Sequence, residues 1–327
     1  MLADRALRAD LSFGLDDAPS ARAARLAECL AGAFGPSTAA IIHYGSHAQR
    51  SDARPESAHD FFVIVDRYLD AYRSLAAAIG TSYSPLTAAI LSHMLPPNVV
   101  SVNASVDAHT VRAKCAVLSL AELTRACSAR ARDHFTQGRL FQHVQLAWSR
   151  DPVSRSAVVD ALLLARARTF EWGRAYLPER FDAQTYCRVL LETSFRAEIR
   201  PEGPERIAAL FEAQRGTLLR VYDTLLRRLT EERILVWDGK VYSESHPPSS
   251  LYRLRVATYF RWSKIRATVR WLKYIALYDN WLEYILHKIA RRSGMSLELT
   301  PRERRWPLVF LWPKAIHYIR QRPQRRR

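Results

Sequence analysis

The sequence predicts a mixed α/β protein in which an α/β front is followed by a helix-rich middle and a basic, aromatic C-terminal segment. Short apolar runs near the N-terminus indicate strands, and steps of three and four between apolar residues indicate helices farther along. With 327 residues and a globular balance of apolar and charged side chains, the chain can bury a substantial core. We therefore expect three segments, at 1–150, 151–250 and 251–327.

The first segment alternates helix and strand signals. Residues 21–34 have helical spacing and end at Gly35-Pro36, a pair that stops helices. The run 38–43 is short, β-branched and apolar, as in a buried strand, and 61–65 is continuously apolar, as in a strand covered on both faces; a polar loop at 51–59 separates them. The other elements expected here are helices at 66–79 and 120–146 and strands at 99–106 and 114–118.

The middle segment is mostly helical by pattern. The helices expected from its apolar spacing lie at 154–176, 185–193 and 206–233. The run 234–242 contains Asp238-Gly239, a residue pair that favours a tight hairpin turn. The proline-containing stretch 243–250 then predicts a linker.

Charge is distributed unevenly along the chain. Residues 251–327 hold 19 Lys and Arg against 4 Asp and Glu, a charge of +15, so residues 1–250 carry only +2 of the total +17. Such asymmetry indicates a polyanionic partner, either an anionic membrane surface or nucleic acid. Five of the eight tryptophans also lie in the basic segment, namely Trp262, Trp271, Trp281, Trp306 and Trp312.

The basic segment has the pattern of an interfacial helix. The helix expected at 271–289 carries one stripe of aromatic and aliphatic side chains, but charged residues interrupt it too often for a bilayer-spanning helix. Together with the polybasic end 320–327, this pattern favours an anionic membrane surface over nucleic acid as the partner. The alternative is a solvated basic helix that packs on the body through its aromatic stripe.

Cysteine usage and the N-terminus bear on the compartment. The four cysteines are scattered without a C-x-x-C pair, which indicates reduced thiols and neither a disulfide framework nor a zinc site. Asp4 and Asp10 and the lack of an apolar run argue against a secretory signal or a transit peptide. We expect a peripheral protein at the cytoplasmic face of a bacterial inner membrane.

One pattern in the first segment indicates a chemistry. Gly45-Ser46 follows the first expected strand, and Asp60 opens the second. Small residues let backbone N–H groups approach phosphate oxygens, and the Ser46 hydroxyl adds a donor. A strand carboxylate can bind Mg²⁺, which compensates the charge of a triphosphate. The pattern predicts nucleotidyl transfer; the alternative is an ordinary strand–turn–strand with Asp60 as a turn residue.

The pattern departs from the usual nucleotidyltransferase pair of acids. The second acid normally follows two residues after the first, where this chain has Phe62. Asp66 shares the face by parity but lies about 20 Å along a regular strand, too far to share a metal ion, so we expect it to cap a helix. The second carboxylate must come from elsewhere, and Asp107 and Glu198 are the candidates.

These residues resemble a known family. Tyr44-Gly45-Ser46 followed by the run 60–66 is similar to the mitochondrial-type phosphatidate cytidylyltransferases, the CDP-diacylglycerol synthases of the translocator assembly and maintenance family. Cys115-Ala116 and His47-Ala48 depart from the family pattern. The resemblance continues in order over about residues 40–200 through Val102-Asn103, Lys114, Ala116-Val117-Leu118-Ser119, Gly138-Arg139-Leu140 and Phe195-Arg196.

The resemblance implies a nucleotidyltransferase fold, a winged-helix-like second domain and a membrane-contacting C-terminal segment. The implied reaction converts CTP and phosphatidate to CDP-diacylglycerol and pyrophosphate with Mg²⁺. It implies that Asp60 binds Mg²⁺ and acts with Lys114 in catalysis, and that Arg139 is structural. The residues implied to bind the nucleotide are Tyr44, Gly45, Ser46, Asn103 and Arg196.

Two alternative functions stay open at this point. One is a nucleotidyltransferase that acts on a soluble or nucleic-acid acceptor, with the basic tail on RNA or DNA. The other is a non-catalytic adaptor that lacks the second acid and is tethered to the membrane by residues 251–327.

Overall fold

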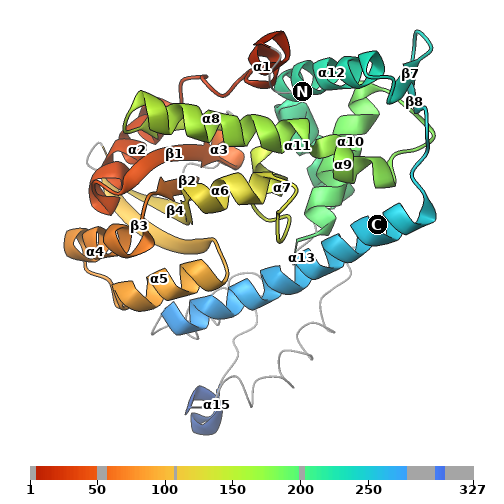
Figure 1. Cartoon of the computed structure of the whole chain (residues 1–327). Coiled ribbons are helices and arrows are strands. Elements are labelled where there is room, and N and C mark those ends of the chain that lie inside the picture. Colours follow the sequence, from red (N-terminus) through yellow and green to blue (C-terminus); the bar gives the residue numbers. More distant parts are fainter. Residues whose placement is uncertain (1–4, 50–56, 107–108, 199–202, 278–298, 306–327) are drawn as a thin grey trace. The chain divides into compact units, whose positions relative to one another are not determined.

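The computed structural model describes residues 5–49, 57–106, 109–198, 203–277 and 299–305. Residues 1–271 form one compact unit and residues 272–327 another. A five-stranded mixed sheet of order β3-β4-β2-β1-β5 organises the first unit, which confirms the predicted α/β class (Figure 1). The strands are β1 (Thr38–Tyr44), β2 (His59–Val65), β3 (Asn98–Val106), β4 (His109–Ser119) and β5 (Gln145–Ser149).

The apolar strand β2 lies at the centre of the sheet. It is antiparallel to β1 and parallel to β4, while β3 and β5 add antiparallel strands at the two edges. Helices α2 and α4 cover one face of the sheet, and α6 and α8 cover the other. The helices around the sheet are α2 (Ala21–Phe34), α3 (Ser46–Gln49), α4 (Tyr68–Ile79), α5 (Pro85–Met94), α6 (Leu120–Cys127), α7 (Gln137–Leu140) and α8 (Pro152–Ala167).

A helical layer with a small sheet follows α8. Its three strands have the order β6-β8-β7, and α1 (Arg5–Leu11) packs against α12. The hairpin expected at 234–242 is confirmed by the pairing of β7 with β8. The elements here are α9 (Thr169–Gly173), the 3₁₀ turn η1 (Arg174–Tyr176), β6 (Arg180–Phe181), α10 (Ala183–Arg196), α11 (Pro204–Ala213), α12 (Arg215–Glu231), β7 (Leu235–Trp237) and β8 (Tyr242–Glu244).

The long helix α13 (Ser250–Leu277) follows the small sheet. The expected segment boundaries fall between β5 and α8 and at the first residue of α13, and they stay predictions. Most of the helix expected at 271–289 and the end 320–327 lie outside the described residues, and the second unit contributes α15 (Pro301–Arg305). Within the described part of the chain, no helix has the length and hydrophobicity to cross a bilayer.

Local signals predicted several elements correctly. The helix expected at 21–34 is α2, whose first turn is capped because the Ser20 hydroxyl accepts a hydrogen bond from Ala23 N. The strands expected at 38–43 and 61–65 are β1 and β2, and both are buried on both faces. Those expected at 99–106 and 114–118 are confirmed as β3 and as part of β4.

The single helix expected at 120–146 is wrong. The chain forms α6, an irregular stretch, the short α7 and then β5. Two tertiary interactions override the local helical preference. The Asp133 carboxylate accepts hydrogen bonds from Arg270 Nη2 at 2.7 Å and Arg266 Nε at 2.9 Å, and residues 145–149 pair with the edge of β1.

The helices expected at 206–233 and 154–176 are each interrupted. Gln214 separates α11 from α12 because its side chain accepts a hydrogen bond from His143 N and donates one to Gln142 Oε1. Near Arg168, α8 gives way to the short α9 and a 3₁₀ turn. At Gln214, a side chain that bonds across the fold thus divides a stretch whose apolar spacing is continuous.

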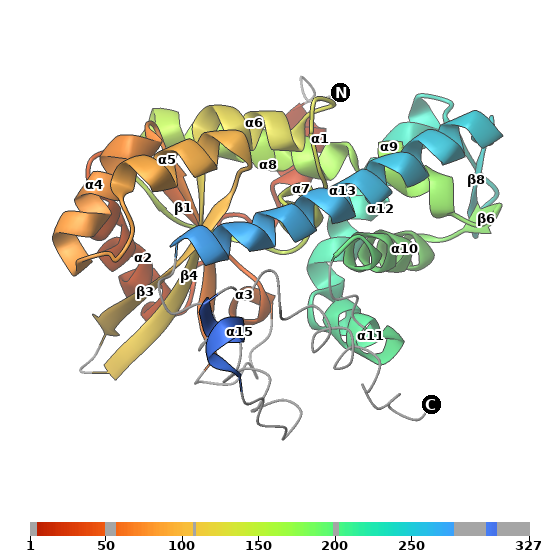
Figure 2. The same ribbon diagram turned by 90° about the horizontal axis from the view of Figure 1, so that it is seen from below.

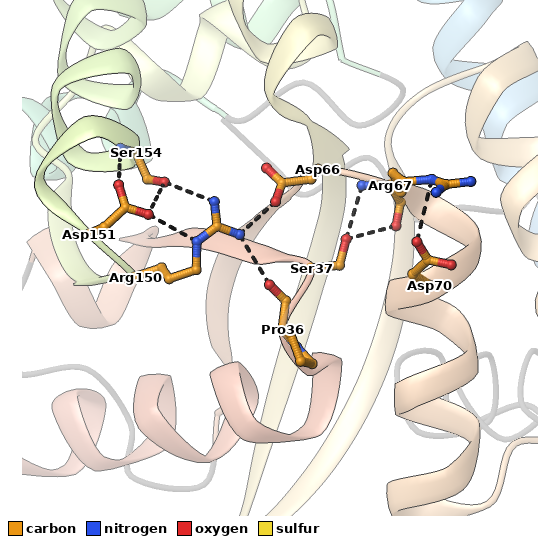
Figure 3. A network of polar contacts seen from close by, with 8 residues as sticks. All are labelled: Pro36, Ser37, Asp66, Arg67, Asp70, Arg150, Asp151 and Ser154. Atoms are coloured by element: carbon orange, nitrogen blue, oxygen red, sulfur yellow. Dashed lines mark hydrogen bonds and ion pairs between the residues drawn. The ribbon is translucent and has the colours of Figure 1, made fainter.

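Asp66 does not cap a helix as the sequence suggested. The residue at the N-terminal cap of α4 is Arg67, which makes no side-chain capping bond. Asp66 instead accepts a hydrogen bond from Arg150 Nη1 at 2.5 Å, and the same nitrogen contacts the Pro36 carbonyl (Figure 3). This ion pair ties the end of β2 to the segment between β5 and α8, at the opposite end of the strand from Asp60.

A buried guanidinium joins three parts of the first unit. Arg166 on α8 is fully buried, and its Nη1 donates to the carbonyls of Leu11 at 2.6 Å and Phe13 at 2.8 Å. Its Nη2 donates to the Gln142 carbonyl at 3.3 Å. Burial lowers the pKa of Arg166 to about 10, so the group stays charged at neutral pH.

We expect Arg166→Ala to lower the free energy of unfolding by about 3 kcal/mol, because three buried carbonyls lose their donor and a cavity opens. Arg155→Ala is the matched control on the same helix, since its exposed ion pair with Asp16 is worth less than about 1 kcal/mol. Urea unfolding followed by circular dichroism measures both variants. Equal stability of the two variants would contradict the role assigned to Arg166.

Candidate functional site

Strand pairing brings three predicted site residues to one place. Tyr44 on β1 pairs with Asp60 on β2, and Asp60 pairs with Lys114 on β4. Paired residues point to the same face of a sheet, so their side chains lie side by side. The Lys114 Nζ lies 4.0 Å from Asp60 Oδ1. A carboxylate and an ammonium group thus meet directly beside the turn that follows β1.

Gly45 is the residue that lets this turn approach the carboxylate. Its φ is +80°, and a Cβ at this position would lie 2.8 Å from Asp60 Oδ2. Both the positive φ and the close approach favour glycine. Ser46 begins the short α3, whose first turn closes when Ala48 N and Gln49 N donate to the Gly45 carbonyl. The Gly45-Ser46 turn and Asp60 are therefore in contact.

Asp60 is largely withdrawn from solvent, with 27% of its side chain exposed. Burial raises the pKa of the Asp60 carboxyl, and the charges of Lys114 and Arg139 oppose that shift. A cation bound at this carboxylate would further favour its charged form. Mg²⁺ commonly binds proteins through one or two carboxylates and completes its shell with water and phosphate oxygens, so Asp60 fits as a ligand for it.

Arg139, for which the resemblance implies a structural role, is fixed by contacts within its own part of the chain. Its guanidinium lies 3.8 Å above the centre of the Phe135 ring, and its Nη1 donates to the Phe135 carbonyl at 2.8 Å. The same side chain acts electrostatically on both Asp60 and Tyr44. Arg139 thus ties α7 to the residues just before it, and its positive charge also acts on Asp60. The Gly138-Arg139 motif was the sequence signal for this position.

The two candidates for a second carboxylate have different outcomes. Glu198 pairs with Arg139, with 2.8 Å between its Oε1 and Arg139 Nη2, and that pairing engages its charge. Asp107 lies outside the described residues. Among the residues that the structure describes, no group of three or more His, Cys, Asp or Glu side chains is placed to hold a metal ion. Asp60 therefore stays the carboxylate on which a metal site would be built.

The remaining predicted nucleotide-binding residues, Asn103 and Arg196, lie on β3 and α10. Asn103 is exposed on the edge strand β3, where it pairs with Arg112, whereas Ser101 is the residue opposite Lys114. Arg196 is exposed at the end of α10. Burial raises the pKa of Tyr176 and the charge of Arg196 opposes that shift, which places Arg196 near Tyr176. Asn103 thus lies diagonally across from Lys114 on the same face of the sheet, and the nucleotide-binding role of Asn103 and Arg196 stays a prediction.

Three histidines form a stack on the other face of β1 and β2. His43 Nδ1 and Gln145 Oε1 lie 3.0 Å apart, and His59 Nδ1 lies 3.3 Å from His43 Nε2. The His47 ring stacks on His59 with 3.9 Å between centroids. Burial lowers the pKa of His43 to about 4 and that of His59 to about 3, so both rings are neutral at pH 7. A neutral ring can donate from one nitrogen and accept at the other, as this chain of bonds requires.

The buried face of α13 supports the loop that carries Arg139. Asp133 binds Arg266 and Arg270 of α13 through Oδ2, and its Oδ1 accepts from Phe135 N at 3.1 Å. The Phe135 ring contacts the guanidinium of Arg139 at 3.8 Å and that of Arg270 at 4.6 Å. The Phe135 ring thus links Arg270 of α13 to Arg139, whose charge acts on Asp60.

Comparison with known proteins adds no assignment, because no protein-family model matches the chain and no curated protein sequence is significantly similar to it.

We expect stability to fall as the pH drops from 7 to 5. The unfolded chain protonates its histidines near pH 6.5, whereas folded His43 and His59 resist protonation down to about pH 4 and about pH 3. The contribution of these two histidines to the free energy of unfolding is therefore complete above pH 6.5 and decreases below it. At pH 5 the decrease is about 1–2 kcal/mol for each ring. Urea unfolding at the two pH values measures the change.

The matched variants for this prediction are His59→Gln, which removes one buried ring, and His93→Gln, which alters an exposed histidine. We expect His59→Gln to reduce the pH dependence and His93→Gln to leave it nearly as it is. The same pH dependence in all three proteins would show that the buried histidines do not cause it.

Proposed function

We propose that the protein is a Mg²⁺-dependent nucleotidyltransferase that converts CTP and phosphatidate to CDP-diacylglycerol and pyrophosphate. The observation that carries the proposal is the contact between the Gly45 backbone and the Asp60 carboxylate, with Lys114 4.0 Å away. It joins a turn suited to phosphate, a carboxylate suited to Mg²⁺ and a cation. The choice of CTP and phosphatidate, and the nucleotidyltransferase fold with a winged-helix-like second domain, rest on the family resemblance.

In the proposed reaction a phosphate oxygen of phosphatidate attacks the α-phosphorus of CTP. The new P–O bond forms as the bond between the α-phosphorus and the bridging oxygen breaks, and pyrophosphate leaves. Backbone N–H groups of Gly45 and Ser46 would hold phosphate oxygens, while Lys114 and Arg139 would offset the negative charge that both substrates bring. Mg²⁺, held through Asp60, would supply further charge compensation.

We propose a peripheral attachment to the cytoplasmic face of a bacterial inner membrane through residues 251–327. The longer described stretch of this segment supports the idea, because residues 251–277 contain Lys and Arg but no Asp or Glu. An anionic leaflet attracts such a segment by about 1 kcal/mol for each Lys or Arg near the surface. Nucleic acid is the less favoured partner, since phosphatidate itself resides in a membrane.

One observation favours a second candidate function. Glu198 pairs with Arg139, and the described residues contain no other group of acids around Asp60 that could hold a metal ion. A membrane-tethered adaptor without catalytic activity would not need carboxylates that bind a metal ion. The adaptor differs from the enzyme in a measurable way, because it would bind vesicles without forming a liponucleotide.

The test is turnover of labelled CTP with Mg²⁺ and vesicles that contain phosphatidate, read as liponucleotide and pyrophosphate. We expect Asp60→Asn to lower the rate at least about 100-fold, because the ligand for Mg²⁺ loses its charge. Asp66→Asn is the matched control, since Asp66 lies at the other end of the same strand and pairs with Arg150. We expect it to change the rate less than about threefold.

Thermal unfolding of both variants checks that each one folds. Full activity of Asp60→Asn would exclude the proposed metal ligand. An unaltered protein that neither binds CTP nor forms product, yet binds vesicles, would establish the adaptor instead.

A further inference from the structure

Exposed apolar side chains gather on two helices. Of the twelve large apolar side chains that are exposed among the described residues, eight lie on α5 and α13. Exposed apolar residues scattered singly are ordinary on protein surfaces, but a concentration on neighbouring elements indicates an interaction surface.

Helix α5 exposes its large apolar side chains to solvent and buries its small ones, which is unfavourable in water. The helix buries the small residues Ala88, Ala89 and Ser92 and exposes Leu86, Ile90 and Met94, whose exposed fractions are 57%, 49% and 67%. The exposed residues recur every four positions and therefore form one stripe. Residues 85–94 contain no Asp, Glu, Lys or Arg. A helix that buries its small residues and exposes its large ones gains stability only if another apolar medium covers it.

The outward face of α13 combines apolar and basic side chains. Val256, Phe260 and Ser263 are buried against the body of the unit. On the opposite side Leu254, Trp262, Ile265 and Val269 are exposed, and Arg255, Arg261 and Lys264 are exposed among them. Apolar side chains with a tryptophan between Lys and Arg residues are typical of helices that lie in a membrane interface.

The two helices lie on the same side of the first unit. Arg270 of α13 donates from Nε at 3.1 Å and from Nη2 at 2.9 Å to the carbonyl of Pro96, two residues after the end of α5. Both helices run along the lower edge in Figure 1, and both lie in front of the sheet when the unit is seen from below in Figure 2. The two exposed stripes therefore lie on helices that are neighbours on this side of the unit.

We propose that α5 and α13 together form a surface that docks on an anionic lipid bilayer, with the stripe of Leu86, Ile90 and Met94 inserted among the lipids. This inference extends the membrane attachment proposed above from residues 251–327 to a helix within the first 150 residues, and it does not require nucleotidyl transfer.

The charge of α13 favours an anionic bilayer over a second copy of this chain as the partner. A second copy of the chain would bring Arg255, Arg261 and Lys264 close to the same cations of its partner, and like charges facing each other weaken association. Anionic headgroups complement these cations, and acyl chains cover the apolar stripes. The basic face of α13 and the uncharged stripe of α5 would then have complementary roles, attraction by the first and insertion by the second.

Vesicle binding of the full chain, measured without CTP, tests the proposal. Vesicles of phosphatidylcholine with about one third phosphatidylglycerol serve as the probe. We expect the triple variant Leu86→Ser, Ile90→Ser, Met94→Ser to lower the partition coefficient at least about tenfold, since three inserted side chains are lost. A variant with Val153→Ser, Val236→Ser and Trp237→Ser is the matched control, because it removes three exposed apolar side chains elsewhere. We expect it to bind as the unaltered protein does.

A second measurement reports insertion directly. Ile90→Cys labelled with an environment-sensitive fluorophore, in a background with the exposed Cys29 changed to Ser, should shift to shorter wavelength on anionic vesicles. The same label at Val153→Cys should not shift.

Three outcomes would overturn the proposal. They are unchanged vesicle binding by the α5 triple variant, equal binding to vesicles of phosphatidylcholine alone, and a dimer in vesicle-free solution that the α5 substitutions dissociate. Because no nucleotide is present, failure here leaves the CTP assay unaffected, and loss of CTP turnover leaves vesicle binding unaffected.

Discussion

The Asp60 carboxylate lies at the start of an otherwise apolar strand, and the arrangement of the site follows from that placement. Burial raises the pKa of this carboxyl, while Lys114 on the neighbouring strand and Arg139 on a separate loop supply opposing charge. The backbone beside it must be glycine, because a Cβ at residue 45 would collide with the carboxylate. The Asp60 carboxylate, the two cationic side chains and the Gly45-Ser46 turn suit a polyanionic substrate that binds together with a metal cation.

The loop that carries Arg139 depends on α13. Asp133 accepts hydrogen bonds from two arginines of that helix, and the Phe135 ring separates Arg270 from Arg139. The same helix exposes basic and apolar side chains on its other face. α13 therefore has one face that supports the residues around Arg139 and another that suits a membrane surface, so the proposed attachment and the proposed chemistry would be linked through one helix.

Buried polar side chains hold together parts of the unit that are far apart in the sequence. Gln214 and Arg166 bond to backbone or side-chain groups far away in the sequence, and each bond satisfies a buried group that would otherwise be costly. The histidine stack works in the same way, because its neutral rings form a chain of hydrogen bonds from Gln145 on β5 through His43 on β1 to His59 on β2. Such bonds have no periodic signal in the sequence.

The sequence by itself determined the mixed α/β class, the strands at 38–43 and 61–65 and the helix at 21–34. It also indicated that the Gly45-Ser46 turn and Asp60 belong to one candidate site. Apolar runs, turn residues and caps act over a few neighbouring residues, so they can be recognised locally. Only the tertiary structure decided that residues 120–146 are not one helix, that Asp66 binds Arg150, that Glu198 binds Arg139 and that Asn103 pairs with Arg112. Those outcomes depend on which distant charge or strand edge a residue meets, and such partners are chosen by the packing of the whole unit.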